Sequence, residues 1–324
     1  MAEQDPWAPF EGKYKIHEES REYGRFITAN MSQPILDAGF EKSREQVLDL
    51  CLALAGQIEF EGEETEMIIP SPHVSEGIPV TVYKPASRPD VPAILIHFHG
   101  GALIFCNRKT HETVAKIIAR DSGAIVVHVE YRLLPNPDAP CAPFDDAEVV
   151  TRWVLENKVV VGGKPQSKVG VGGDSAGGQL AISVTNEVTG LDFQILVYPV
   201  ADTALKQDTV KEFKHLLGLN EDSVLFMQET AFKPIPNYLT NPKVNGMART
   251  NTASSPPALI ILAELDPLRG CGIDYANKLR AAGVKVQLEI IEGVLHGFLL
   301  YIQCFRTTSS QAFDRIAKFV KQFQ

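Results

Sequence analysis

The stretch VGVGGDSAGG, residues 169–178, places Ser175 inside a Gly-x-Ser-x-Gly frame, directly after a short run of β-branched residues. A strand that reverses abruptly into a helix holds its central residue in strained backbone geometry, and small neighbours let that side chain stand clear. A dinucleotide fingerprint would need a glycine where Ser175 stands, and no Gly-Lys-Ser/Thr follows as a Walker loop requires. Ser175 is therefore the candidate nucleophile, while the pentapeptide by itself also fits a tight packing corner.

Composition bounds the class of protein. With 324 residues the chain can bury one large core, and we expect a single domain, 1–324, that carries insertions. Hydrophobic residues make up 44% of the chain and charged residues 22%, which argues against long disordered stretches. The net charge is -9 and no run of Lys and Arg appears, so we expect no nucleic-acid partner and favour a small, largely apolar ligand.

The first residues and the cysteines predict a cellular location. The segment Met-Ala-Glu-Gln-Asp-Pro is acidic and lacks a basic region followed by an apolar stretch, so it does not resemble a secretory signal. No apolar run approaches the length that crosses a bilayer, and we expect no membrane span. The five cysteines are scattered, without a Cys-x-x-Cys pair. These features predict a cytoplasmic protein.

From about residue 80 onward, short apolar runs rich in β-branched residues alternate with helical patterns. This alternation is typical of parallel strands joined by crossover helices, and it predicts an α/β fold with a doubly wound, mostly parallel sheet. The expected strands are 78–83, 93–98, 124–131, 168–171, 193–197, 258–262 and 286–291. The expected helices are 110–120, 145–156, 176–188, 273–282 and a last one capped by Ser310 and ending near residue 323.

Two segments interrupt this alternation. Residues 1–60 are helical in pattern, and Val47, Cys51 and Leu54 are spaced to share one apolar face. A long excursion at about 202–250 lies between two strands, and loops of that length in a compact domain are usually functional. The apolar faces favour packing into the core, and both segments would also suit a helical cap over the carboxyl edge of the sheet.

A serine nucleophile needs a base within hydrogen-bonding reach and a carboxylate that orients the base. In α/β-hydrolases the chain order is Ser, then Asp or Glu, then His. Downstream of Ser175, Glu264 and Asp266 follow one expected strand, and His296 lies between glycines after the next. We prefer Asp266 to Glu264 because it lies one step further into the loop. His296 is preferred as the base because His215 falls in the helical pattern of the excursion.

Acyl transfer also needs donors for the oxyanion of the tetrahedral intermediate, each worth about 3 kcal/mol when lost. The segment IHFHGGA, residues 96–102, follows an apolar strand, and its two glycines let backbone N–H groups approach a substrate closely. Gly100 and Gly101 are therefore candidate oxyanion donors. The N–H of Ala176, next to the nucleophile at a helix N-terminus, is the further candidate.

Taken together, these motifs resemble the hormone-sensitive-lipase-like family of α/β-hydrolases, the carboxylesterase group with a Gly-Asp-Ser-Ala-Gly elbow. The resemblance covers about residues 78–323, and the motifs follow one another in the family's order. They are His99-Gly100-Gly101, Tyr131-Arg132-Leu133, Gly173-Asp174-Ser175-Ala176-Gly177-Gly178, Tyr198-Pro199, Asp266-Pro267-Leu268 and His296-Gly297-Phe298.

The resemblance implies an α/β-hydrolase fold with a helical cap from the two segments described above. It implies hydrolysis of carboxylic esters through an acyl-enzyme, without a cofactor or metal. Ser175 would be the nucleophile, His296 the general acid and base, and Asp266 its orienting carboxylate. The apolar caps, which lack basic clusters, favour short- or medium-acyl esters, acetyl esters included, of small apolar molecules. A homodimer is a candidate assembly.

The sequence departs from the family pattern at two positions. The third glycine of the His-Gly-Gly-Gly loop is Ala102 here, and the alanine suits the oxyanion site if its backbone does not need a positive φ. Which two of the Gly100, Gly101 and Ala102 amides point inward is left open. The glutamate that usually follows Leu-x-Pro is Asn136, so an ion pair made by that glutamate would be missing.

Three other functions fit parts of the sequence. A small-molecule receptor with this fold, as among the plant gibberellin receptors, would lack the catalytic histidine, whereas His296 is present. A natural-product cyclase or eliminase could use the same three residues and would return an isomer or a dehydrated product. His97 and His99, two positions apart on a strand, could face a metal, but no further ligands are identifiable.

Overall fold

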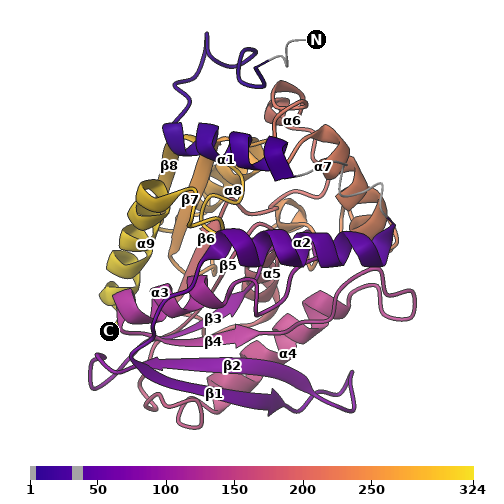
Figure 1. Cartoon of the computed structure of the whole chain (residues 1–324). Helices are drawn as coiled ribbons and strands as arrows, with labels where there is room; N and C mark the ends of the chain where they lie inside the picture. The colour runs from indigo at the N-terminus through magenta and orange to yellow at the C-terminus, as the bar shows by residue number, and fades with distance from the viewer. Residues whose placement is uncertain (1–4, 31–38) are drawn as a thin grey trace.

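The computed structural model of the chain describes residues 5–30 and 39–324. Eight strands form one sheet in the order β1-β2-β4-β3-β5-β6-β7-β8 (Figure 1). Strand β2 pairs antiparallel with both of its neighbours, and the strands from β4 to β8 pair in parallel. The strands are β1 Gly62–Ile69, β2 Ile78–Pro85, β3 Ile94–Phe98, β4 Ile125–Val129, β5 Val169–Asp174, β6 Phe193–Val197, β7 Ala258–Leu265 and β8 Val286–Leu295.

Helices cover both faces of the sheet. Residues from α4, α5 and α8 pack on one face, and residues from α3 and α9, with α1 and α2, pack on the other. The α-helices are α1 Glu18–Asn30, α2 Phe40–Ala55, α3 Glu112–Ser122, α4 Ala142–Glu156, α5 Ala176–Glu187, α6 Asp208–Glu212, α7 Glu221–Met227, α8 Arg269–Ala281 and α9 Arg306–Val320. A π-helical turn, Gln228–Phe232, and two 3₁₀ turns, Gly246–Ala248 and Lys321–Phe323, complete the elements.

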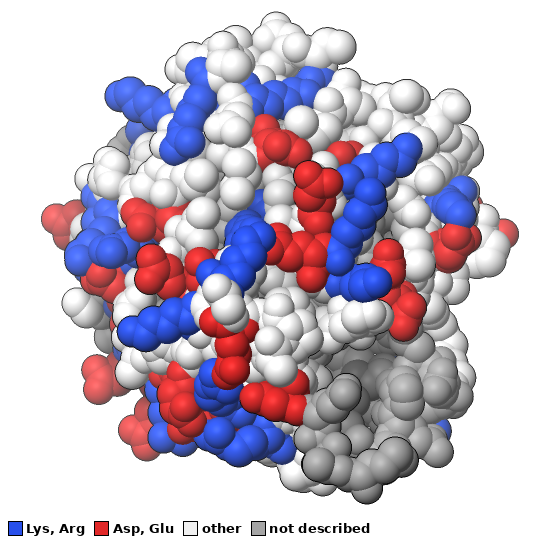
Figure 2. All heavy atoms as spheres, turned by 90° about the horizontal axis from the view of Figure 1, so that it is seen from above, with Lys and Arg blue, Asp and Glu red and all other residues white. Residues whose placement is uncertain are grey.

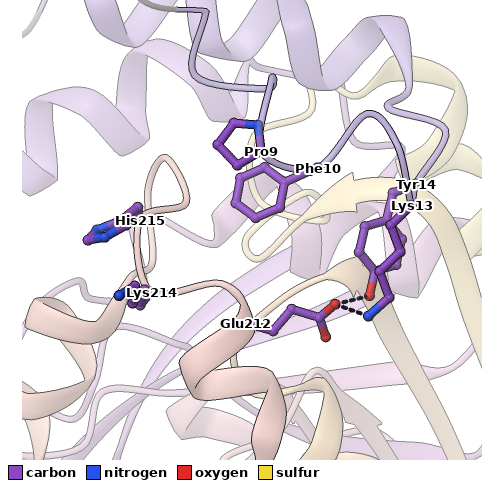
Figure 3. A pocket seen from close by; sticks show the side chains of 7 residues that line it. All are labelled: Pro9, Phe10, Lys13, Tyr14, Glu212, Lys214 and His215. Atoms are coloured by element: carbon purple, nitrogen blue, oxygen red, sulfur yellow. Dashed lines mark hydrogen bonds and ion pairs between the residues drawn. The ribbon is translucent and has the colours of Figure 1, made fainter.

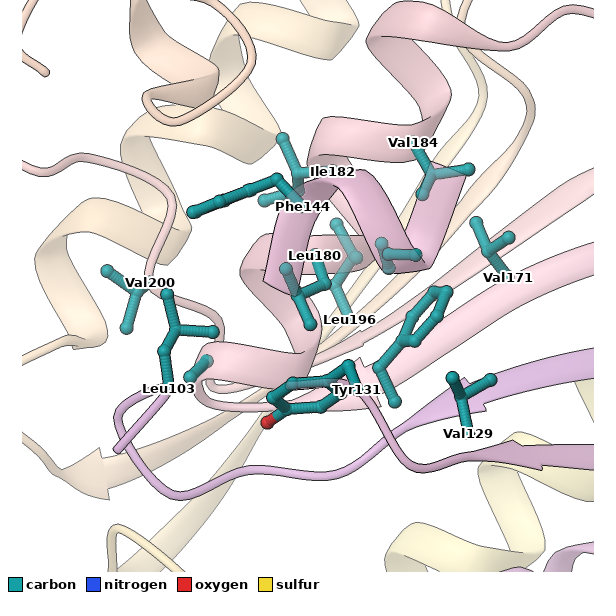
Figure 4. Close-up of a cluster of buried hydrophobic side chains, with 14 of the residues drawn as sticks. Leu103, Val129, Tyr131, Phe144, Val171, Leu180, Ile182, Val184, Leu196 and Val200 are labelled. Atoms are coloured by element: carbon teal, nitrogen blue, oxygen red, sulfur yellow. The ribbon is translucent and has the colours of Figure 1, made fainter. Parts of the chain in front are cut away.

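The two faces of the sheet carry two hydrophobic cores, and successive residues of a central strand contribute to one core and then to the other. In β3, Ile94 and Ile96 belong to the core under α4 and α5, whereas Leu95 belongs to the core under α3 and α9. Every residue of β3 to β6 is buried, because a parallel strand covered on both faces has no solvent side. Figure 4 shows the first of these cores, where Phe144 and Leu180 approach the sheet from the helices. The predicted doubly wound fold is confirmed.

Several elements differ from the sequence prediction: α8 begins at Arg269, four residues before the predicted start, and β8 runs to Leu295, four residues past the predicted end. Strand β1 is not predicted, because its sequence GEETEMII is mostly exposed and carries no apolar run until its end. Helix α9 begins at Arg306, four residues before the predicted cap. The carboxylate of Glu19, in α1, accepts hydrogen bonds from the N–H groups of Thr307 (2.6 Å) and Thr308 (3.1 Å). The first turn of α9 is thus capped from 288 residues away, and no local signal marks it.

The two segments predicted to form a cap contact one another. The hydroxyl of Tyr14 donates to Glu212 Oε1 (2.6 Å), and Lys13 pairs with the same carboxylate (Figure 3). Figure 3 shows a pocket at this junction, lined from one side by Phe10 and Tyr14 and from the other by Glu212 and His215. Helices α1, α6 and α7 lie at the end of the molecule opposite β1 and β2 (Figure 1). That these segments act as a lid stays a prediction.

The surface seen from above carries basic and acidic side chains interspersed with one another (Figure 2). Among the described residues on that face, no broad area of one sign of charge appears. Within residues 5–30 and 39–324, none of the helices is both long and apolar enough to cross a membrane.

Candidate active site

Ser175 lies at the turn between β5, which ends at Asp174, and α5, which begins at Ala176. Its backbone has φ 54 and ψ -118, a conformation that residues other than glycine rarely adopt. The turn is tight because a Cβ at Gly177 would lie 2.0 Å from the carbonyl oxygen of Phe98, and one at Gly173 would lie 2.3 Å from the same atom. The Gly-x-Ser-x-Gly frame is therefore required by packing on both sides of the serine.

The three side chains predicted to act together are within hydrogen-bonding distance of one another. His296 Nε2 lies 2.9 Å from Ser175 Oγ, and His296 Nδ1 lies 2.8 Å from Asp266 Oδ2. A carboxylate only accepts hydrogen bonds, so the ring proton sits on Nδ1 and Nε2 is free to accept from the serine hydroxyl. Ser175, Asp266 and His296 each directly follow a strand, β5, β7 and β8, so the parallel register brings them to one edge of the sheet.

The carboxylate beside the histidine belongs to Asp266, as predicted, and not to Glu264. Asp266 is fully buried, and its second oxygen accepts the N–H of Leu268 (2.7 Å). Glu264 Oε2 instead accepts the N–H of Gly293 (2.8 Å) and so holds the end of β8 against β7. The ring of Tyr198, at 4.5 Å between centroids, packs against His296 and limits its movement.

The loop after β3, residues 100–106, is called the oxyanion loop, after the role that the sequence analysis predicts for it. The N–H of Gly100 donates to Asp174 Oδ1 (3.1 Å) and approaches His111 Nε2 (3.3 Å). This bonding is at odds with the predicted role of Gly100 as an oxyanion donor, since its proton is already directed at a buried carboxylate. The N–H groups of Gly101 and Ala102 have no acceptor within residues 5–30 and 39–324.

The backbone of the oxyanion loop is unusual at the position where the family pattern has a third glycine. The sequence analysis expects alanine to suit this position only if the backbone does not need a positive φ. Ala102 has φ 59, so that condition is not met. Such a conformation costs a non-glycine residue roughly 1–2 kcal/mol. Gly101, with φ 116, cannot be replaced so easily, because a Cβ there would lie 2.2 Å from the carbonyl oxygen of Phe105.

A second buried pair, which sequence reasoning did not find, stands behind the nucleophile. His111 Nε2 lies 3.3 Å from Asp174 Oδ1, and His111 Nδ1 lies 2.8 Å from the hydroxyl of Thr110. Burial alone would raise the pKa of Asp174, but its electrostatic interaction and hydrogen bond with the nearby His111 ring outweigh burial and hold the pKa below its usual value. Asp174 lay in the quoted motif, whereas His111 is 63 residues away and carries no motif of its own.

Three further histidines are buried next to this pair. Burial lowers the pKa of His97 to about 4 and that of His99 to about 3, and it lowers the pKa of His128 well below its ordinary value. His99 stacks on Tyr131 and its Nδ1 lies 2.8 Å from the carbonyl oxygen of Gly100. No cluster of three or more His, Cys, Asp or Glu suited to a metal ion occurs in the described part of the chain.

A twisted parallel sheet with a Ser–His–Asp arrangement at its carboxyl edge defines an α/β-hydrolase. The chain belongs to the family described as alpha/beta hydrolase fold, which matches residues 95–300.

Its relatives include proteins with assigned activities. An ethyl acetate hydrolase of Pseudomonas putida is 32% identical over 232 residues, which are 68% of this chain and 71% of that protein. The carboxylesterase NlhH of Mycobacterium tuberculosis is 35% identical over 229 residues, again 68% and 71% of the two chains. Among solved structures, an ester hydrolase from the metagenome of Lake Arreo, complexed with a bipyridine phosphonate derivative, superposes with a TM-score of 0.87. It is 25% identical, and the match covers 95% of this chain and 99% of that one.

Proposed function

We propose that the protein is a serine carboxylesterase of the hormone-sensitive-lipase-like group that hydrolyses short- or medium-acyl esters of small apolar molecules. The observation that carries this proposal is the continuous hydrogen-bonded series from Ser175 Oγ through His296 to Asp266. The carboxylesterases among the relatives support the reaction class, and the ethyl acetate hydrolase supports a small acyl group.

In the proposed reaction, His296 Nε2 takes the proton of the Ser175 hydroxyl as its oxygen attacks the ester carbonyl. The C=O π bond opens, and its electron pair becomes the oxyanion of a tetrahedral intermediate. When the oxyanion collapses, the ester C–O bond breaks, and the imidazolium gives its proton to the departing alcohol. Water then attacks the acyl-enzyme by the same route, releasing the acid and restoring Ser175. Asp266 keeps the ring proton of His296 on Nδ1 throughout.

For the oxyanion we assign the N–H groups of Gly101, Ala102 and Ala176. Gly101 and Ala102 replace the predicted Gly100 because their protons are free of other acceptors in the described part of the chain, whereas the Gly100 proton is directed at Asp174. Ala176 is the first residue of α5, where an N–H has no partner within the helix. Each such donor contributes about 3 kcal/mol to the stability of the transition state.

The substrate class follows from what surrounds these groups. The oxyanion loop itself contains the buried apolar residues Leu103, Ile104 and Phe105, and Phe226 from α7 stacks on Phe105 with 6.2 Å between ring centroids. These neighbours offer no partner to a charged acyl or alcohol group, whose burial without one is costly. Uncharged esters are therefore the proposed substrates.

The test is a series of p-nitrophenyl esters from acetate to decanoate, measured with the wild type and with Ser175→Ala. We expect turnover by the wild type that favours the shorter chains and disappears in the variant. An organophosphonate should add once per chain, on Ser175, as read by mass spectrometry of peptides. A wild type that binds an apolar ester without hydrolysing it would point to a receptor, and an isomerised or dehydrated product from candidate natural esters would point to a cyclase or eliminase.

A further inference from the structure

Helix α2 of the N-terminal segment lies along the oxyanion loop and contacts it at three places. Near the start of the helix, the Phe40 ring packs against Phe105, with 6.3 Å between centroids. Towards its end, Cys51 Sγ lies 3.9 Å from Cys106 Sγ. Between these contacts Arg44 reaches the backbone of the loop. The middle contact is the one that bears on catalysis, because it is made to main-chain atoms.

The guanidinium of Arg44 bridges two loops. Its Nε donates to the carbonyl oxygen of Ile104 (3.0 Å) and its Nη2 donates to the carbonyl oxygen of Leu134 (2.9 Å). The group is held from other sides as well, since it lies 4.4 Å from the Phe40 ring centroid and 3.5 Å from the carboxylate of Glu41. Two directed hydrogen bonds from one rigid, planar cation fix the positions of both carbonyl groups.

Peptide planarity carries this restraint from Ile104 to the oxyanion site. The C=O of Ile104 and the N–H of Phe105 belong to one trans peptide and point in opposite directions. That N–H donates to the carbonyl oxygen of Gly101 (2.7 Å). The C=O of Gly101 in turn shares a peptide with the N–H of Ala102, which must point the opposite way. Arg44 at one end and the Ala102 proton at the other are thus joined through two rigid peptide planes.

A second route ends on the same carbonyl group. Leu134, which Arg44 holds by its C=O, donates its N–H to the carbonyl oxygen of Leu103 (2.8 Å). The peptide of Leu103 also contains the N–H of Ile104, which donates to the carbonyl oxygen of Gly101 (2.9 Å). The Gly101 carbonyl oxygen therefore accepts two hydrogen bonds, and Arg44 contacts both routes to it. The first route runs through shared peptide planes, and the second passes through the backbone of Leu134.

The loop needs such external support. Four of its residues, Gly101, Ala102, Leu103 and Cys106, have φ between 59 and 116. Non-glycine residues persist in this region only where their surroundings over-determine it. Without the contacts to Arg44, the Gly101–Ala102 peptide would be free to rotate towards a less strained conformation and to turn the Ala102 N–H away.

We propose that Arg44 is a positioning residue of the esterase: from the N-terminal cap helix, it holds the Gly101–Ala102 peptide in the orientation that stabilises the oxyanion. The inference rests on the proposed function and adds to it a direct link between the cap and the chemical step. It follows that removal of Arg44 weakens binding of the transition state and leaves binding of the ester ground state largely intact.

The experiment compares Arg44→Ala with Lys42→Ala, a control on the exposed side of the same helix. With p-nitrophenyl acetate we expect Arg44→Ala to lower kcat about tenfold to a hundredfold with KM within about threefold, since a lost oxyanion donor costs about 10²–10³. The rate of Ser175 phosphonylation should fall in parallel. Lys42→Ala should match the wild type in all three. Arg44→Lys, which keeps one directed donor, should recover part of kcat, and added ethylguanidinium should raise the rate of Arg44→Ala alone.

Each outcome decides the matter. If Arg44→Ala keeps its kcat within about twofold, or if only KM rises, the positioning role is wrong while the esterase proposal stands. If Arg44→Ala is poorly folded, Arg44→Lys carries the test, and a wild-type kcat in that variant overturns the two-bond clamp. A wild type with no ester turnover overturns the proposed function, and the role of Arg44 with it.

Discussion

The triad and the oxyanion loop are held in two different ways. Ser175, Asp266 and His296 each follow directly after a strand, and the parallel register of the sheet carries them to one edge. The oxyanion loop has a strained backbone, and residues far along the chain contact it, Arg44 among them. In our proposal the site therefore combines one part that the sheet positions with another that helix α2 positions, and the two can be disturbed separately.

The largest effect should come from the part that the sheet holds. Asp266→Asn removes the acceptor that keeps the His296 proton on Nδ1, and we expect kcat to fall about 10⁴-fold. The matched control is Glu264→Gln, which alters the competing carboxylate two residues away and should leave kcat within about threefold. Initial rates with p-nitrophenyl acetate measure both. Equal losses in the two variants would show that the assignment of the acid is wrong.

On the loop side, Gly101→Ala should be the most damaging single change. The added Cβ would meet the carbonyl oxygen of Phe105 at 2.2 Å, so the Gly101–Ala102 peptide must shift, and we expect kcat to fall about 10²-fold. Gly190→Ala is the control, because Gly190 also has a positive φ of 91 but open space around it. It should cost about 1 kcal/mol of stability and no activity. An active Gly101→Ala variant would contradict the importance of this peptide.

The histidines beneath the loop should make the fold sensitive to acid. The pKa of His97 is lowered to about 4 by burial, so between about pH 6.5 and 4 the unfolded state binds a proton that the folded state does not. Stability is therefore full above pH 6.5 and falls as the pH drops, by about 2 kcal/mol at pH 5 for His97 alone. Urea unfolding at pH 7 and pH 5 measures the fall.

Two variants isolate this contribution. His97→Gln should lose less stability between pH 7 and pH 5 than the wild type, because the titrating group is gone. His73→Gln, at an exposed position, should behave as the wild type does. Identical pH dependence in all three proteins would rule out His97 as a source of the acid sensitivity.

The smallest effect should come from Ala102→Gly. Glycine relieves the strain of φ 59, worth roughly 1–2 kcal/mol, but the more flexible unfolded chain costs about 1 kcal/mol of stability, so the stability should change by no more than about 1 kcal/mol. Removing the methyl group leaves the N–H in place, and kcat for the acetate ester should stay within about threefold. The ratio of kcat/KM for octanoate to that for acetate should rise if the methyl group narrows the acyl site.

The positions of Ser175, Asp266 and His296 can be predicted from the sequence for a physical reason. Apolar runs ending in Ser175, Asp266 and His296 are local patterns, and a parallel sheet converts their common position at strand ends into a common position in space. Strand β1 has no such pattern, because most of its residues are exposed and several are glutamates. It is recognisable as a strand only by its pairing with β2. Of the residues in the site, Arg44 and His111 escape prediction because a contact across 60 or more residues leaves no trace in local spacing.

The same limit applies to the donors of the oxyanion site. The glycines of the loop indicate that some backbone N–H groups approach the substrate, but they do not indicate which ones. Our assignment depends on the buried carboxylate of Asp174, which accepts a hydrogen bond from the N–H of Gly100, and on the positive φ of Ala102. Neither can be read from a run of residues that contains only Gly and Ala.

The carboxylate of Glu19 has a consequence for the order in which the molecule is built. Its partners, Thr307 and Thr308, lie 288 and 289 residues further along the chain, and Ser20 beside it bonds the carbonyl oxygen of Gly293 (2.7 Å). During synthesis the first helix therefore emerges from the ribosome long before its binding surface exists. The sheet can grow strand by strand in the meantime, but helix α1 takes its final place only after the last helix has begun to emerge.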